Sequence, residues 1–216
     1  MRLYEFIMPM DTYGEFEDPE GPQEKRLKKL HSQGDEVSSG GYATVFSHDL
    51  PKRLNQVRKM PNKEEPSFEN DPYILYVKSI LKLKENGYKN SYFPRIIKFK
   101  EVKDRNSQNS YIVDIETLHH EDTFDNEVIN SIKKKIFHNT ERIGKITNPD
   151  MAALIVDAYE KNPENIKDTE FLQALNIIHR IDNNFSETMF DISGQFNHMY
   201  RISGTMPQLV LSDPLG

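Results

Sequence analysis

Two stretches near the C-terminus decide the fold that we expect for this chain. The first runs from residue 179 to residue 190 and begins His179-Arg180-Ile181-Asp182, with Glu187 five residues beyond the aspartate. The second reads Leu209-Val210-Leu211-Ser212-Asp213-Pro214. Alternating, β-prone residues at 198–202 and 208–211 predict a pair of strands, the second of which leads directly to Asp213. The predicted order is therefore an acid in a loop, a second polar side chain, a hairpin, and another acid directly after an apolar strand.

This order of oxygen-bearing side chains is suited to a magnesium site. Mg²⁺ is usually held by one or two carboxylates together with phosphate groups and water. A further carboxylate nearby can orient an attacking hydroxyl in phosphoryl transfer. A plainer interpretation is that these acids cap turns, as Asp and Asn side chains do routinely.

Two upstream segments add groups that suit a phosphate-bearing ligand. Ser38-Ser39-Gly40-Gly41-Tyr42 combines small residues with an aromatic one ahead of a strand, so its backbone could fold closely over phosphates. Val57-Arg58-Lys59 lies on the next predicted strand, from which an inward-facing lysine could reach phosphate oxygens. Taken singly, the first segment is better explained as an ordinary glycine turn in a hairpin, and the lysine of the second as a solvated side chain on a strand.

Periodicity and turn residues predict an α+β protein. Strands are expected at 42–47, 56–60, 96–102 and 111–116, with a helix at 72–86 between them, so residues 1–118 form an antiparallel sheet with one helix. The second half is mainly helical, at 124–146, 149–161 and 169–178, followed by strands at 187–192, 198–202 and 208–211. Asn148 is expected to cap the helix that starts at Pro149. A further short helix is predicted at 23–33.

Composition narrows the class of protein. The 216 residues include no cysteine, which excludes disulfides, thiolate metal sites and a cysteine nucleophile. The net charge of −6 argues against a nucleic-acid or anionic-membrane partner. The first residues carry an early glutamate and no long apolar segment, unlike a signal peptide. We therefore expect a soluble, cytoplasmic protein that has no membrane partner and binds no nucleic acid.

The ordered set of segments resembles the protein-kinase-like superfamily, in particular the small kinase-like proteins of tailed bacteriophages. In that pattern a Gly-rich loop precedes a strand lysine, a catalytic loop has an Asn five residues beyond its Asp, and a strand pair ends in a metal-binding Asp. The resemblance implies a two-lobed fold, with a sheet-rich N-lobe at 1–118 and a truncated, mainly helical C-lobe at 119–216. It also implies ATP and Mg²⁺ as cofactors, and the host cytoplasm as the location of a phage protein.

The resemblance assigns roles residue by residue. Asp182 matches the catalytic acid and Lys59 the phosphate-binding lysine. Asp213 and Glu187 match the metal ligands. The positions matching the phosphate-covering loop are Ser38, Gly40, Gly41 and Tyr42, and those matching the adenine-binding hinge are Glu116 and Leu118.

Three departures favour an alternative. Glu187 stands where the family has asparagine and adds a negative charge opposite the phosphates. The helix at 72–86 has no clear glutamate to pair with Lys59. The sequence given ends three residues after Asp213, without the later segments that bind peptide substrates in the family. The alternative is a catalytically impaired pseudokinase that senses nucleotide or binds a host or phage protein, whereas the first hypothesis is a phosphotransferase of unknown acceptor.

Overall fold

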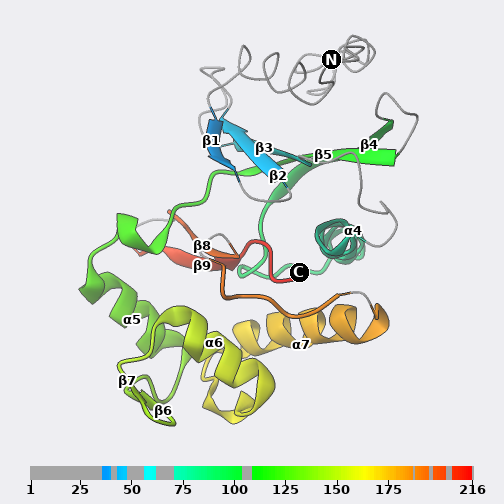
Figure 1. The fold of residues 1–216 in the computed structure, drawn as a ribbon. Coiled ribbons are helices and arrows are strands. Elements are labelled where there is room, and N and C mark those ends of the chain that lie inside the picture. The colour runs from blue at the N-terminus through cyan, green and yellow to red at the C-terminus, as the bar shows by residue number, and fades with distance from the viewer. Residues whose placement is uncertain are drawn as a thin grey trace. The chain divides into compact units, whose positions relative to one another are not determined.

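The computed structural model describes residues 36–39, 43–47, 56–61, 71–103, 109–186, 188–194, 197–202 and 206–215 (Figure 1). The chain divides into two compact units. Among the described residues, unit 1 contains 36–61 and 95–117, and unit 2 contains 71–94 and 118–215. The fold is α+β, as predicted.

Unit 1 is a five-stranded antiparallel sheet. Its strands are β1 (Glu36–Ser39), β2 (Ala43–Ser47), β3 (Gln56–Pro61), β4 (Ile96–Lys103) and β5 (Asn109–Glu116), in the order β1-β2-β3-β5-β4. Every pairing is antiparallel. The four strands predicted for the first half are confirmed, whereas β1 was not expected as a strand.

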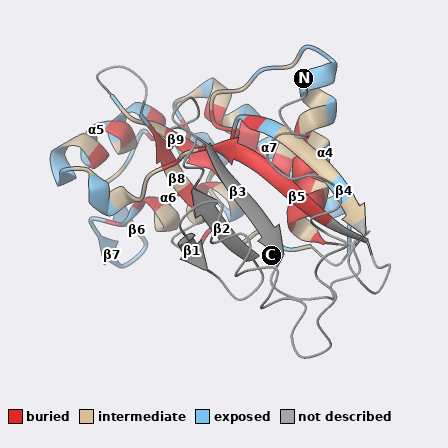
Figure 2. Cartoon of the chain, turned by 90° about the horizontal axis from the view of Figure 1, so that it is seen from above, coloured by how far each residue is buried: buried red, intermediate tan, exposed pale blue. Residues whose placement is uncertain are grey.

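Strand β5 has buried residues on both of its faces, from Tyr111 to Glu116 (Figure 2). Asp114 is fully buried among them. A buried carboxylate is costly unless it is paired. In the register of the sheet, Arg58 on β3 and Lys98 on β4 are the two partners of Asp114, so basic residues lie at the neighbouring strand positions on either side.

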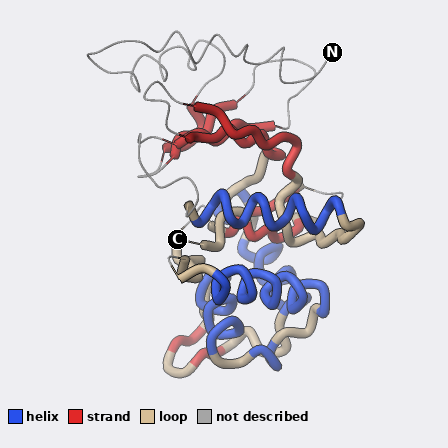
Figure 3. The backbone as a smooth tube through the Cα atoms, turned by 90° about the vertical axis from the view of Figure 1, so that its right-hand side faces the viewer, coloured by secondary structure: helices blue, strands red, loops and turns tan. Residues whose placement is uncertain are grey.

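Unit 2 contains four α-helices and two short hairpins (Figure 3). The helices are α4 (Pro72–Glu85), α5 (Asn126–Ile136), α6 (Met151–Glu160) and α7 (Thr169–Asn184), with single 3₁₀ turns η1 (Glu121–Thr123) and η2 (Pro163–Asn165). The hairpins are β6 (Arg142–Ile143) with β7 (Ile146–Thr147), and β8 (His198–Arg201) with β9 (Gln208–Leu211).

Helix α7 supplies much of the core of unit 2. Phe171 is fully buried, with its ring centroid 4.9 Å from that of Tyr92 and 5.7 Å from that of Phe137. The buried residues of α7 recur at helical spacing, as expected for one apolar stripe, and comprise Phe171, Ala174, Leu175, Ile178 and Ile181. Asp168 caps the helix by accepting hydrogen bonds from the backbone N–H groups of Glu170 and Phe171 at 2.9 and 3.1 Å.

Residues 91–93 come just before the chain passes from unit 2 back to unit 1. They are hydrogen-bonded to the β8–β9 hairpin. The buried guanidinium of Arg201 donates to the carbonyls of Ser91 and Phe93, each at 2.9 Å. The backbone N–H of Leu211 donates to the carbonyl of Tyr92 at 2.8 Å. Residues 91–93 therefore lie against the hairpin, and α4, which precedes them, belongs to the same unit.

Three predictions about helices and strands are wrong. The helix expected at 124–146 ends at Ile136, and its last residues form the β6–β7 hairpin, which turns at Gly144 with φ of 54°. The cap of α6 is Asp150, which accepts from the N–H of Ala153 at 2.7 Å, and Asn148 lies outside the helix. The strand expected at 187–192 is reduced, among the described residues 188–192, to an isolated bridge between Phe190 and Leu215.

A fourth difference concerns the end of α7. The helix continues through residues 179–184, where a loop was expected. The reason is that Ile178 and Ile181 extend the apolar stripe, and no glycine or proline interrupts it before Phe185. The division of the chain also differs from the one expected: both place a boundary near residue 118, but α4 groups with unit 2. The predicted helix at 23–33 lies outside the described residues.

Replacing the cap of α7 should destabilise the protein more than replacing the cap of α6. Asp168→Ala removes two backbone contacts and the acceptor of the Tyr92 hydroxyl, which lies 2.8 Å away. We expect a loss of about 2 kcal/mol, against about 1 kcal/mol for the matched Asp150→Ala, which removes one backbone contact. Urea denaturation of both variants measures the difference, and equal losses would contradict it.

Candidate functional site

The base of the β8–β9 hairpin gathers three polar residues from separate parts of the sequence. The carbonyl of Asn197, directly before β8, accepts from the N–H groups of Ser212 and Asp213 at 2.9 and 3.2 Å. The N–H of Asp191 donates to the carbonyl of Pro214 at 2.9 Å. We call Asp191, Asn197 and Asp213 the hairpin-base site, since all three are tied together through backbone bonds at this end of the hairpin.

Hydrogen bonds of Asp191 join it to Ser193 and to Asn197. The Oδ1 atom of Asp191 accepts from the N–H of Ser193 at 3.1 Å and from its hydroxyl at 2.7 Å. The side-chain amide of Asn197 donates to the carbonyl of Asp191 at 3.0 Å. Because the Nδ2 end of the carboxamide is used in this way, its Oδ1 end is the oxygen that could face a ligand.

Gly194 leaves room for the Asn197 side chain in this arrangement. A Cβ atom at position 194 would lie 2.9 Å from Nδ2 of Asn197, closer than non-bonded atoms approach. The N–H of Asn197 also donates to the carbonyl of Gly194 at 2.9 Å. A larger residue at 194 would therefore displace the side chain that bonds to Asp191.

The donor set of the hairpin-base site fits a hard divalent cation. Asp213 is half-buried and offers a carboxylate, and Asn197 offers a carboxamide oxygen. Mg²⁺ commonly takes only one or two protein carboxylates, with phosphate and water completing its shell. The described residues hold no cluster of three or more His, Cys, Asp or Glu side chains that could hold a metal ion.

Two buried tyrosines of α4 lie near Asp213. The hydroxyl of Tyr76 donates to the carbonyl of Leu211, two residues before Asp213. Burial raises the pKa of both Tyr73 and Tyr76 well above the ordinary value, and the charge of Asp213 raises each further. The side of α4 that meets this hairpin thus presents neutral phenols, and the one acid within the helix, Glu85, is exposed at its end.

Asp182, the expected catalytic acid, lies in the last turn of α7. Its carboxylate accepts from the Tyr159 hydroxyl at 2.8 Å and from the Thr188 hydroxyl at 3.3 Å. The Tyr159 ring stacks on Phe190, with centroids 3.7 Å apart. Asp182 is therefore bonded to neighbours that join α6, α7 and the following segment, and its catalytic role stays a prediction.

The other assigned residues fall into two groups. Glu187, Gly40, Gly41 and Tyr42 lie outside the described residues. Ser38 lies on β1 and Lys59 on β3 of unit 1, where the backbone of Lys59 is in register with Val45 and Val113. The predicted meeting of Lys59 with Asp213 stays a prediction, since the two residues belong to different units.

The expected hinge lies where the chain passes from unit 1 to unit 2, between Thr117 and Leu118. Glu116 is fixed within unit 1, because its Oε1 accepts from the N–H of Arg95 at 2.8 Å and its own N–H donates back at 3.2 Å. His119 is fixed within unit 2 by two backbone bonds of 2.8 Å to Tyr200. Only Thr117 and Leu118 stand between these two attachments.

A second polar cluster lies beside β8. The Tyr200 hydroxyl donates to the Glu121 carboxylate at 2.8 Å, and Nε2 of His198 lies 3.8 Å from the same carboxylate, an ion-pair rather than a hydrogen-bond distance. The His198 imidazole is the largest influence that lowers the pKa of Glu121; burial opposes it, and the Tyr200 hydroxyl reinforces it. Glu121 thus anchors η1 to the hairpin.

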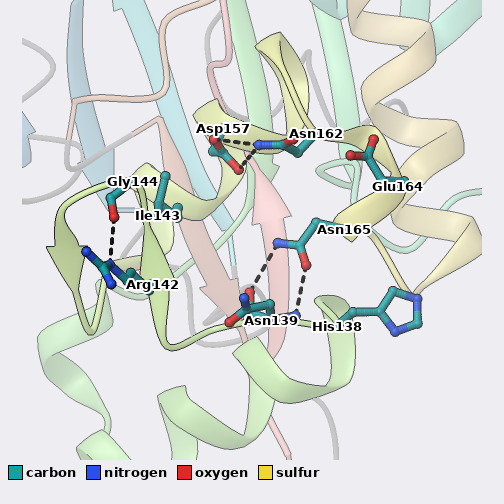
Figure 4. Close-up of a pocket in the computed structure, with 9 residues that line it drawn as sticks. All are labelled: His138, Asn139, Arg142, Ile143, Gly144, Asp157, Asn162, Glu164 and Asn165. Carbon is teal, nitrogen blue, oxygen red and sulfur yellow. Dashed lines mark hydrogen bonds between the residues drawn. The ribbon is translucent and has the colours of Figure 1, made fainter.

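A depression of about 440 Å³ lies elsewhere in unit 2, around the β6–β7 hairpin (Figure 4). Most of its polar groups bond to one another. Asn165 exchanges hydrogen bonds with the backbone of Asn139, and Asn162 donates to both oxygens of Asp157. This depression shares no residue with the hairpin-base site, and we assign it a structural role.

Sequence reasoning did not single out Asp191 or Asn197. The signal available for Asn197 is its place directly before β8, the strand that pairs with β9 and so lies beside the strand leading to Asp213. Asn197 immediately precedes β8, whereas Glu187 lies eleven residues before that strand. The loop at 179–187 was chosen on its His-Arg-Ile-Asp motif, which the structure places on a helix.

Comparison with protein families and with curated proteins finds no match to this chain. No helix in the described part of the chain is both long enough and apolar enough to cross a lipid bilayer.

A double-mutant cycle on Asp182 and Tyr159 should show strong coupling. Each of Asp182→Ala and Tyr159→Phe removes the same 2.8 Å hydrogen bond, so we expect about 1 kcal/mol of destabilisation for either. The double variant should lose less than the sum of the two, because the second change removes a bond already broken. Urea denaturation measures all four proteins, and additive losses would argue that this bond contributes nothing.

The contribution of Glu121 to stability should depend on pH. A carboxylate whose pKa is lowered by folding stabilises the protein above its ordinary value of 4.5, and that stabilisation is lost as the pH falls through the folded-state pKa. Glu121→Gln should therefore be less stable than the original protein near neutral pH, and the gap should close below about pH 4.5. Urea midpoints across the pH range test this. The exposed Glu127→Gln is the control, and a gap of constant size for Glu121→Gln would be inconsistent with the expected linkage.

Proposed function

We propose that this protein is a kinase-like phosphotransferase that binds ATP with Mg²⁺ and acts on an acceptor hydroxyl. The observation that supports the proposal is the hairpin-base site. An acid, an asparagine and a second acid are joined there by backbone bonds across a strand pair. This order and grouping are those of the catalytic loop and metal-binding acid in protein kinases.

The proposal moves two roles from the positions that sequence resemblance suggested. Asp191 takes the place of Asp182 as the acid that orients the acceptor, and Asn197 takes the place of Glu187 as the second cation ligand. Asn197 restores the asparagine of the family pattern, although it follows Asp191 by six residues where that pattern has five. Asp213 keeps its proposed role.

The proposed site residues would act by orienting the reacting groups and by their charge. Bound ATP with Mg²⁺ would supply a phosphoryl group for the acceptor hydroxyl, with ADP as the leaving group. Asp213 and the Oδ1 atom of Asn197 would hold the cation, and Asp191 would accept the hydrogen bond of the acceptor hydroxyl and then its proton. Lys59 and the loop at Ser38–Tyr42 would bind the phosphates, with the backbone at Glu116 and Leu118 holding adenine.

The alternative is a pseudokinase that binds nucleotide, or a host or phage protein, without phosphoryl transfer. It is favoured by α4, which turns tyrosines toward the hairpin and carries no acid before Glu85. The two hypotheses differ in turnover. The phosphotransferase would transfer phosphate from ATP, whereas the pseudokinase would bind ATP without releasing or transferring phosphate.

Nucleotide binding is expected to depend on both Mg²⁺ and Asp213. At one hundred times Kd, ATP with Mg²⁺ should stabilise the full chain by about 2.7 kcal/mol, or raise Tm by roughly 5–10 °C. Asp213→Asn should abolish the rise, whereas Asp182→Asn should keep it, because Asp182 bonds to Tyr159 in the folded protein. Asp191→Asn should keep the rise and lose phosphoryl transfer from radiolabelled ATP.

Three results would separate the hypotheses. No rise for the unmodified protein at millimolar ATP and Mg²⁺ would overturn nucleotide binding. A rise without turnover would support the pseudokinase. Retained turnover in Asp191→Asn, with loss in Asp182→Asn, would return the catalytic role to Asp182.

A further inference from the structure

Helix α4 is attached to the strand that leads to Asp213. Tyr76 is fully buried, and its hydroxyl donates to the carbonyl of Leu211, the last residue of β9. Only Ser212 separates that carbonyl from Asp213. The backbone N–H of Leu211 donates to the carbonyl of Tyr92. Both the N–H and the carbonyl of Leu211 are therefore hydrogen-bonded to residues within the segment 71–94.

The same attachment is reinforced by packing. The Tyr76 ring meets Phe93 edge to face, with ring centroids 6.2 Å apart. Ile74 and Val77, on either side of Tyr76, are also buried. Helix α4 therefore has little freedom to move away from β9 without breaking a buried hydrogen bond and exposing apolar surface.

We propose that Tyr76 is a positioning residue for the cation site, holding the end of β9 so that Asp213 stays aligned with Asn197. The inference rests on the function proposed above, in which these two side chains hold the divalent cation. The physical reason is geometric: a carboxylate and a carboxamide bind one ion well only when their separation is fixed. Tyr76 touches neither ligand, and it acts through the carbonyl of Leu211.

The phenols of α4 beside Asp213 are neutral. Burial raises the pKa of both Tyr73 and Tyr76, and the charge of Asp213 raises each further, so both keep their hydroxyl hydrogen. Tyr76 donates this hydrogen to the carbonyl of Leu211, two residues before Asp213.

The test measures the affinity of the full chain for Mn²⁺ alone, by electron paramagnetic resonance, at a temperature where every variant is folded. Tyr76→Phe should weaken Mn²⁺ binding about three- to tenfold, the effect of one buried hydrogen bond. Tyr159→Phe is the matched control, since it removes a hydroxyl in the same unit that bonds to Asp182 on α7 instead. Both variants should lose thermal stability, and Tyr159→Phe should bind Mn²⁺ as the unmodified protein does.

A second measurement covers the case in which Tyr76→Phe does not fold. Hydrogen exchange of the unmodified protein should slow in α4 as well as in β8 and β9 when Mn²⁺ is added, because the Tyr76 bond couples them. Protection confined to the hairpin would overturn the proposal, and so would equal Mn²⁺ affinity in Tyr76→Phe and Tyr159→Phe. Absence of Mn²⁺ binding in the unmodified protein, or binding unchanged in Asp213→Asn, would instead refute the cation site itself.

Discussion

The backbone carbonyl of Asn197 is the hydrogen-bond acceptor that holds the base of the β8–β9 hairpin together. It takes the N–H groups of Ser212 and Asp213 and so closes the β8–β9 hairpin at its open end. The side chain of the same residue returns to Asp191, whose own N–H reaches Pro214. One residue thus joins three segments, through its main-chain carbonyl and its side-chain amide.

The charges of the hairpin-base site are those expected if the proposed function is right. Asp191 and Asp213 are both acids in half-buried surroundings, and phosphate groups would add further negative charge. Repulsion among such groups grows as water is excluded, so a divalent ion would stabilise the proposed assembly. Arg201, the buried cation of β8, already donates to Ser91 and Phe93, and the phenols of α4 are neutral.

The sequence predicted the sheet of unit 1 and the β8–β9 hairpin well, because alternation and β-prone residues are local signals. It predicted the end of α7 poorly, since Ile178 and Ile181 continue the apolar stripe through a motif that suggested a loop. The pairing of Asp191 with Asn197 was missed for a different reason. The pairing depends on which residues lie next to the hairpin in space. The sequence analysis relied instead on the five-residue spacing between Asp182 and Glu187. The place of α4 in unit 2 follows from contacts such as Tyr76 with Leu211, which no local pattern encodes.

Unit 2 is discontinuous in the chain, and this affects how the protein is made. The Tyr76 hydroxyl and its acceptor are 135 residues apart, with the whole of β4 and β5 of unit 1 synthesised between them. At ribosomal speeds of about 5–20 residues per second, α4 waits roughly 7–27 s before its partner strand exists. During that interval the apolar face of α4 lacks its native cover from β9. The nascent chain is therefore exposed to chaperones and proteases, and a fragment starting at residue 118 would lack the groups that Arg201 binds.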